Sequence, residues 1–222
     1  MVFEDIPSDP SLADPLPPSP FAIVGRWLDE ARAQRVQRNP NAMSLATVCA
    51  LGRPSLRVVL CRGFEPEPGY VVFYTDRSSQ KGRALADRPA AAASFHWDAL
   101  QRQVRIEGPV VHSPDAESDA YFAGRPRPSQ IAAWSSRQSA PLASREAFLE
   151  KLRITEERFE REAPEAIPRP PSWGGYRLFA ERVELWVGSL GRAHDRALWT
   201  RSLEREGEGF RGGEWSVGRL QP

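Results

Sequence analysis

Cationic side chains stand at both ends of one apolar run of this sequence. In the segment from Leu56 to Arg62, the apolar residues 58–61 lie between Arg57 and Arg62. A buried guanidinium is costly unless it meets an anion, so this placement indicates anion binding. By strand parity the two arginines point to opposite faces, and we expect them to serve two different anions. Strand-end charges that simply reach solvent are the alternative.

A second candidate begins at Ser78 and Ser79. These hydroxyl residues lead into an expected helix, with Gln80 and Lys81 in its first turn. Free backbone N–H groups and the positive end of the helix dipole favour a phosphate there. Helix capping by one of the serines, without any ligand, explains the same pattern.

A third candidate lies between two expected helices. Tyr121 and Arg125 are four residues apart and share a helical face, and the prolines that follow Arg125 end that helix. Ser129 can cap the next helix. A phenol, a guanidinium and a helix N-terminus together suit a phosphate dianion. A plain helix–turn–helix corner is the alternative.

The fourth candidate is the segment that holds His194. It lies between Arg192 and Arg196, a few residues after Trp186. An imidazole there can donate a hydrogen bond or accept a proton. Placement of the whole segment on the surface, without a role in chemistry, is the alternative.

Motifs for several other chemistries are absent from the sequence. It has no phosphate-binding P-loop and no G-x-S-x-G. His96, His112 and His194 do not stand at metal-ligand spacing with one another or with the two cysteines, so no metal site is expected.

The elements that must position these residues are mostly strands. Short apolar runs separated by turn signals predict a β-barrel with peripheral helices. The expected strands are 44–50, 56–62, 70–75, 90–97 and 101–111, then a last β section from 176 through 183–187 and 197–201 to 215–220. The expected helices are 21–38, 81–87, 115–123, 129–135 and 144–161. We expect a proline-rich, flexible arm over residues 1–20 and a single domain over 21–222.

The overall charge narrows the range of partners. Lys and Arg total 30 against 29 for Asp and Glu, a formal net charge of +1. This balance gives no reason to expect nucleic acid or an anionic membrane. Without a signal peptide or a long apolar stretch, and with only two cysteines, we expect a cytoplasmic protein.

Taken together, these segments resemble the pyridoxamine 5′-phosphate oxidase family. The matching segments, in order, are Asn41–Val48, Arg57–Leu60, Val72–Thr75, Arg102–Gly108, Arg125–Pro126, Ser129–Ile131, Ala133–Trp134, Arg137–Ser139, Ser172–Leu178, Arg192, His194–Arg196 and Arg219–Pro222. The resemblance runs from about Phe21 to Pro222.

The resemblance implies a split β-barrel homodimer with flavin mononucleotide (FMN) at the subunit interface. It assigns FMN binding to Arg57, Val58, Val59, Leu60, Tyr74, Thr75, Gln80, Lys81, Gln103, Gln138, Ser139, Trp186 and Arg196. It assigns the substrate phosphate to Arg62, Tyr121, Arg125 and Ser129, and the catalytic positions over the pyridine ring to Arg192 and His194.

The implied reaction is oxidation of pyridoxine or pyridoxamine 5′-phosphate to pyridoxal 5′-phosphate, with O₂ as acceptor and release of H₂O₂. Arg62, Val187 and Ala193 depart from the residues usual in the family. Two alternatives therefore stay open. One is a related FMN oxidase of secondary metabolism, of the phenazine-biosynthesis type. The other is a split-barrel protein that binds flavin without turnover.

Overall fold

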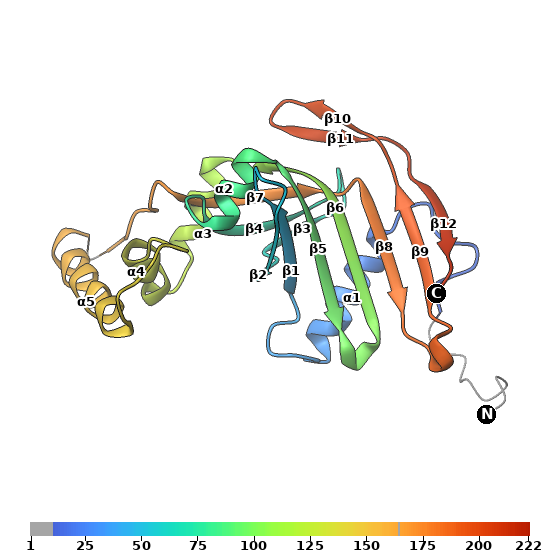
Figure 1. Ribbon diagram of the computed structural model, residues 1–222, viewed down its shortest axis with the longest axis horizontal. Helices are drawn as coiled ribbons and strands as arrows, with labels where there is room; N and C mark the ends of the chain where they lie inside the picture. The colour runs from blue at the N-terminus through green and yellow to red at the C-terminus, as the bar shows by residue number, and fades with distance from the viewer. Residues whose placement is uncertain (1–10, 164) are drawn as a thin grey trace.

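The computed structural model describes residues 11–163 and 165–222 and has an antiparallel sheet at its centre (Figure 1). The sheet order is β12-β9-β8-β6-β5-β1-β2, and β7, β4 and β3 continue it from the far end of β6. Its strands are β1 (Ala42–Val48), β2 (Pro54–Leu60), β3 (Gly63–Glu65), β4 (Tyr70–Asp76), β5 (Ala90–Trp97), β6 (Arg102–His112), β7 (Trp173–Phe179), β8 (Arg182–Val187), β9 (Asp195–Thr200) and β12 (Ser216–Leu220). The mainly β, split-barrel fold expected from the sequence is confirmed.

Strand β6 belongs to both parts of the sheet. Its first half pairs with β8, from Arg102 to Glu107, and its end pairs with β7, from Val110 to His112. Gly108 lies at the change of partner, where a Cβ would stand 2.1 Å from the carbonyl oxygen of Phe179. Only glycine allows the two backbones to approach so closely.

The main hydrophobic core fills the inside of the curved sheet. Alternate residues of the strands point inward, among them Phe95, Val104 and Trp199, each fully buried. Helix α1 (Phe21–Ala33) covers this core with a face that includes Trp27 and Leu28. In Figure 1 the helix lies behind β5, β6 and β8.

A smaller core lies in a helical lobe beside the barrel. The lobe consists of α4 (Arg127–Ser135) and α5 (Arg145–Glu162), and its core joins Ile131 and Phe159 to Phe122 and Trp173. The remaining helices are α2 (Gln80–Asp87), α3 (Asp115–Ala123) and the short η2 (Asp98–Leu100) and η3 (Leu190–Arg192). Figure 1 shows the lobe standing away from the barrel at the left. No helix in the described part of the chain is long and apolar enough to cross a membrane.

Several element boundaries differ from the sequence prediction. Helix α1 ends at Ala33, not near residue 38, because Arg35 adopts a left-handed conformation (φ +49°) and Val36 N–H closes the turn on Ala31 O. Helix α4 begins at Arg127, so Ser129 lies inside its first turn and is not its cap. Strand β3 and the hairpin β10 (Leu203–Glu206) and β11 (Gly209–Gly212) were not predicted, because their glycines and charges resemble those of a loop.

The described part of the N-terminal arm is fastened to the barrel. Leu12 is 4% exposed, and its N–H donates to Asp195 Oδ2 at 2.8 Å. Pro17 O accepts a bond from the indole of Trp199 at 2.9 Å. Residues 11–20 of the expected arm therefore contact the barrel, residues 1–10 lie outside the described part, and the flexibility of the arm stays a prediction.

Leu12→Ala tests whether this attachment stabilises the fold. Removing a buried leucine side chain commonly costs about 2 kcal/mol or more, so we expect a free energy of unfolding lower by about 2 kcal/mol. Urea unfolding measures it, with the exposed Ser11→Ala as control. Equal midpoints for the two variants and the wild type would show that the arm contributes nothing.

Candidate active site

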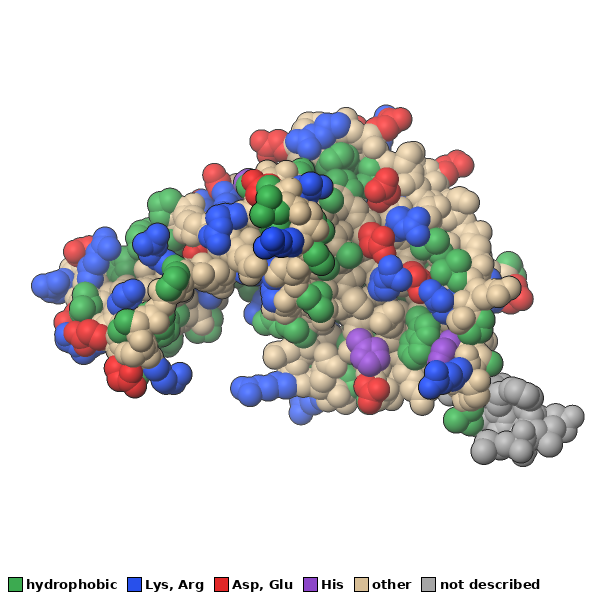
Figure 2. Space-filling model, in the orientation of Figure 1, with side chains coloured by type: hydrophobic (Ala, Val, Ile, Leu, Met, Phe, Trp, Pro, Cys, Tyr) green, Lys and Arg blue, Asp and Glu red, His purple; other side chains and the backbone are tan. Residues whose placement is uncertain are grey.

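An open pocket of about 590 Å³ lies between the barrel and the helical lobe. Figure 2 shows the molecule hollowed between these two parts. The size suits a small organic ligand. Its walls come from β2, β4, β7, α2, α3, α4 and α5 and from the loops next to them. The lining residues are Arg57, Val58, Val59, Leu60, Arg62, Tyr74, Thr75, Asp76, Lys81, Tyr121, Arg125, Ser129, Ala132, Ala133, Ser136, Gln138, Phe148 and Trp173.

Four cationic side chains line this pocket. They are Arg57, Arg62, Lys81 and Arg125, and Asp76 is the single acidic side chain among the lining residues. Within the described residues, none of the four forms an ion pair with a carboxylate. Cations that converge on one cavity without ion-pair partners favour the binding of an anion there.

Lys81 is held by neutral oxygens at the start of α2. Its Nζ donates to Gln138 Oε1 at 2.6 Å, to Thr75 Oγ1 at 3.0 Å and to Ser79 Oγ at 3.2 Å. Burial, with a further contribution from Arg57, lowers the pKa of Lys81 to about 8, although Asp76 acts in the opposite direction. An anion in the pocket would favour the protonated lysine and raise this pKa.

Arg57 projects from β2 across the neighbouring strand β1. Its Nη1 donates to Leu45 O (3.0 Å), Thr47 Oγ1 (2.8 Å) and Ser55 O (2.9 Å), and its Nη2 donates to Ser55 Oγ (2.7 Å). Burial lowers the pKa of Arg57. These bonds to neutral oxygens fix the guanidinium without cancelling its charge.

Stacked aromatic rings form another wall. Tyr74 and Tyr121 lie 4.0 Å apart between centroids at 2°, and Tyr74 and Trp173 lie 5.3 Å apart at 7°. Arg125 Cζ stands 4.8 Å from the centroid of Trp173, and Arg62 Cζ stands 6.0 Å from that of Tyr121. Burial lowers the pKa of Arg125 and raises that of Tyr74.

The pocket brings together twelve of the residues singled out in the sequence. They are Arg57, Val58, Val59, Leu60, Tyr74, Thr75, Lys81 and Gln138 from the expected cofactor set, and Arg62, Tyr121, Arg125 and Ser129 from the expected phosphate set. Strand parity predicted that the side chains of Arg57 and Arg62 point to opposite faces of one strand, and this prediction is wrong. Strand β2 ends at Leu60, and Arg62 lies beyond it in the same pocket as Arg57.

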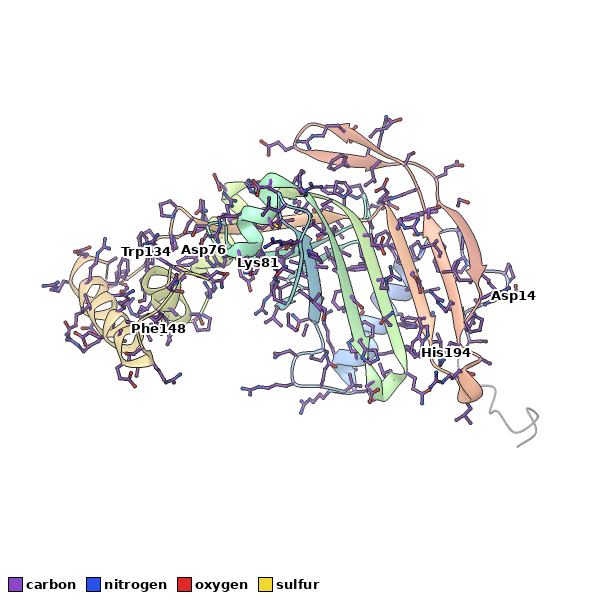
Figure 3. All side chains as sticks on the ribbon, viewed as in Figure 1. Asp14, Asp76, Lys81, Trp134, Phe148 and His194 are labelled. Carbon is purple, nitrogen blue, oxygen red and sulfur yellow. The ribbon has the colours of Figure 1, made fainter. Side chains whose placement is uncertain are left out.

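A second group of predicted residues lies elsewhere on the sheet. Gln103, Trp186 and Arg196 are direct neighbours across β6, β8 and β9. His194 packs on Trp186 with ring centroids 4.7 Å apart, and Arg192 lies exposed in η3. Figure 3 shows Lys81 near the middle of the molecule, next to the lobe, and His194 at the lower right, at the far side of the barrel. Within one protomer, therefore, the residues of this second group do not line the pocket that contains Lys81.

Arg196 has its donors occupied within the second group. Its Nε and Nη2 donate to Glu184 Oε1 at 3.0 and 2.7 Å, and its Nη1 donates to Gln221 O at 3.0 Å. Glu184 is 8% exposed and also accepts from Arg105 at 2.8 Å.

Two expected residues, Gln80 and Ser139, do not line the pocket. Gln80 is the exposed first residue of α2, and Ser139 is exposed next to Gln138 with a φ of +70°. In the described part of the chain, no group of His, Cys, Asp and Glu residues is placed to hold a metal ion.

The pocket also contains residues that sequence reasoning did not select. Asp76 accepts from Ser78 N at 2.7 Å and from Gln138 N at 3.3 Å, and so links the start of α2 to the loop that carries Gln138. Its position directly after Thr75 could have indicated it. Phe148 reaches the pocket from α5, far along the chain, and no local pattern marks it. The others are Ala132, Ala133, Ser136 and Trp173.

Two family models match the chain. The one described as pyridoxamine 5′-phosphate oxidase matches residues 28–159. The one described as the pyridoxine 5′-phosphate oxidase C-terminal dimerisation region matches residues 173–222.

Curated relatives and solved structures agree with these models. A pyridoxine/pyridoxamine 5′-phosphate oxidase of Rubrobacter xylanophilus is 47% identical over 92% of this chain and 88% of its own length. One of Gluconobacter oxydans is 44% identical over 97% and 100%. The crystal structure of PhzG from Burkholderia lata, in complex with tetrahydrophenazine-1-carboxylic acid, has a TM-score of 0.81 and 32% identity, with 94% and 95% coverage. An FMN-binding protein of Nostoc punctiforme, at 20% identity, 90% and 96% coverage and TM-score 0.67, shares the fold.

The lowered pKa of Lys81 predicts pH-dependent anion binding. Sulfate, which stays a dianion throughout, should bind the protonated lysine, so its affinity should fall as the pH rises through about 8. Between pH 7 and 9 we expect a loss on the order of tenfold, one proton being taken up with the anion.

Isothermal titration at each pH measures this affinity. Lys81→Arg keeps its charge throughout this range and should give a much flatter profile. A wild-type affinity that does not change, or an equal fall in Lys81→Arg, would assign the pH dependence to another group.

Proposed function

The chain belongs to the pyridoxamine 5′-phosphate oxidase family, and on this premise we propose that it oxidises pyridoxine or pyridoxamine 5′-phosphate to pyridoxal 5′-phosphate. The proposed enzyme uses FMN and O₂, releases H₂O₂ and works in the cytoplasm. The observation that carries the proposal is the pocket with four cations that form no ion pair within the described residues. The proposed cofactor and the proposed substrate each carry a negatively charged phosphate, and the positive charge of these side chains can balance both.

The side of the pocket near α2 fits the phosphate of FMN. Arg57 and Lys81 lie close enough for the charge of one to lower the pKa of the other. Thr75 and Gln138 share hydrogen bonds with Lys81. Val58, Val59 and Leu60 provide a strand edge against which a flat ring can lie. When bound, FMN supplies the two-electron redox chemistry that protein side chains lack.

The aromatic wall fits the phosphate of the substrate. Arg125 and Arg62 lie on the same wall, Arg125 Cζ at 4.8 Å from the ring centroid of Trp173 and Arg62 Cζ at 6.0 Å from that of the neighbouring Tyr121. Tyr121 and Ser129 add hydroxyl groups on the same wall. Binding a phosphate remote from the reacting carbon contributes energy that positions that carbon.

The second group completes the site from another protomer. Trp186, Arg192, His194 and Arg196 all fall within residues 173–222, which match the dimerisation region. None of them lines the pocket of its own chain, and His194 lies well away from it (Figure 3). In the proposed homodimer each pocket faces these residues, together with Gln103, from the partner subunit.

Within the second group, the Nε2 atom of His194 can donate a hydrogen bond. Ser189 N–H donates to His194 Nδ1 at 3.2 Å, so the neutral imidazole carries its proton on Nε2. In the proposed site that N–H and the Arg192 guanidinium would orient the pyridine ring by hydrogen bonds to its polar atoms.

A phenazine-type oxidation is the second candidate, because the PhzG structure resembles this chain over 94% of its length. The phosphate set favours the vitamin B6 substrate, since an unphosphorylated phenazine carboxylic acid has less use for Arg62, Arg125, Tyr121 and Ser129 together.

The direct test is turnover in air with FMN and pyridoxine 5′-phosphate. We expect pyridoxal 5′-phosphate and H₂O₂ in equal amounts. Arg125→Ala should lower kcat/KM by about 30-fold or more, because a charged partner of the phosphate is lost. The control Arg161→Ala removes an exposed arginine of α5 and should match the wild type. A yellow protein that oxidises tetrahydrophenazine-1-carboxylic acid but neither vitamin B6 phosphate would favour the second candidate.

Mixing two inactive variants tests the shared site. Lys81→Ala damages the pocket and His194→Ala damages the second group, so each homodimer should lose activity. A mixed dimer has one site with both changes and one with neither, so co-refolding the variants should restore part of the wild-type activity. Co-refolding Lys81→Ala with Arg125→Ala, which damage the same pocket, provides the control. No recovery in the first mixture would place both groups in one protomer's site.

A further inference from the structure

Arg125 is held in the pocket by aromatic rings. Its Cζ lies 4.8 Å from the ring centroid of Trp173 and 5.5 Å from that of Phe122. Its Nη1 is buried and makes no hydrogen bond within the described residues. The guanidinium is thus fixed in place while at least one N–H group stays free for a ligand.

The indole of Trp173 is itself firmly placed. Trp173 is the first residue of β7, pairs with Asp76 of β4 and is 8% exposed. Its ring lies parallel to Tyr74 at 5.3 Å and meets the edge of Phe122 at 5.1 Å and 68°. The stack therefore links the position of Arg125 to the backbone of the barrel.

Other arginines near this part of the fold are held differently. Arg169 pairs with Asp115 and Asp119, and Arg177 pairs with Glu117. A carboxylate in the same role beside Arg125 would occupy its N–H donors and cancel its charge. The face of an aromatic ring attracts the cation without accepting its hydrogen bonds. The N–H donors, which lie in the plane of the guanidinium, therefore stay free for a phosphate.

We propose that Trp173 is a positioning residue that fixes the Arg125 guanidinium for the substrate phosphate, and so sets the preference for phosphorylated over unphosphorylated ligands. This inference rests on the proposed function. It assigns Trp173 no chemistry of its own, and its effect passes through Arg125.

The test measures ligand binding to the FMN-loaded protein. Equilibrium dialysis gives the dissociation constants of pyridoxal 5′-phosphate and of pyridoxal, and their ratio measures phosphate preference. Trp173→Leu should reduce this ratio about tenfold, the size of a desolvated cation–ring contact, with the affinity for pyridoxal unchanged. Trp173→Phe, which keeps a ring face, should retain most of the preference.

Two further variants separate positioning from folding. Trp134 packs against the same small core, and Arg158 Cζ lies 5.6 Å from its ring centroid. Trp134 does not line the pocket. Trp134→Leu should lower the melting temperature and leave the ratio at its wild-type value. Trp173→Met, with an unbranched side chain that fills the space without a ring, replaces Trp173→Leu if the latter does not fold.

A double-mutant cycle decides whether Trp173 acts through Arg125. In the Arg125→Ala background, Trp173→Leu should cause no further loss of phosphate preference. Equal ratios in wild type and Trp173→Leu, or additive losses in the cycle, would overturn the inference. A wild-type protein without any phosphate preference would instead contradict the proposed function, before Trp173 is considered.

Discussion

The mutual repulsion of four cations, of which Lys81 is buried, Arg57 and Arg125 are half-buried and Arg62 is exposed, is the constraint on which the pocket depends. Arg57, Arg62, Lys81 and Arg125 gather in one cavity without an ion-pair partner in the described part of the chain. Folding must hold this charge before any anion arrives, at a cost in desolvation. Neutral oxygens stabilise Arg57 and Lys81, and ring faces stabilise Arg125. The supporting groups keep the cations in place but do not neutralise them.

The acidic residues of the chain are used elsewhere. With a net charge of +1 the sequence contains almost as many carboxylates as cations. Those with ion-pair partners lie mainly on α3, on α5 and on the outer sheet, where Glu184 joins Arg105 and Arg196. The local positive field therefore results from the distribution of charge, which composition alone does not reveal.

The sequence was sufficient for most strands and for most helices. Short apolar runs predicted β4 and β5 closely, and the hydroxyl residues before Lys81 predicted the start of α2, where Ser79 caps the helix by accepting from Gly82 N. What it could not provide was three-dimensional grouping. Parity applied to Arg57 and Arg62 failed because β2 ends between them. Phe148 and Trp173 reach the pocket through the packing of the lobe, and a local pattern carries no information about contacts between distant segments.

Strand β6 imposes a limit on how the chain length can vary. One part of it pairs with β8, which carries Trp186, and the other pairs with β7, which carries Trp173. Inserting or deleting a single residue within β6 would turn its following side chains to the opposite face and shift the two groups relative to each other. The hairpin β10–β11 forms a separate two-stranded sheet, so its length can change without that effect. Insertions and deletions among homologous chains should therefore collect in the hairpin and be excluded from β6.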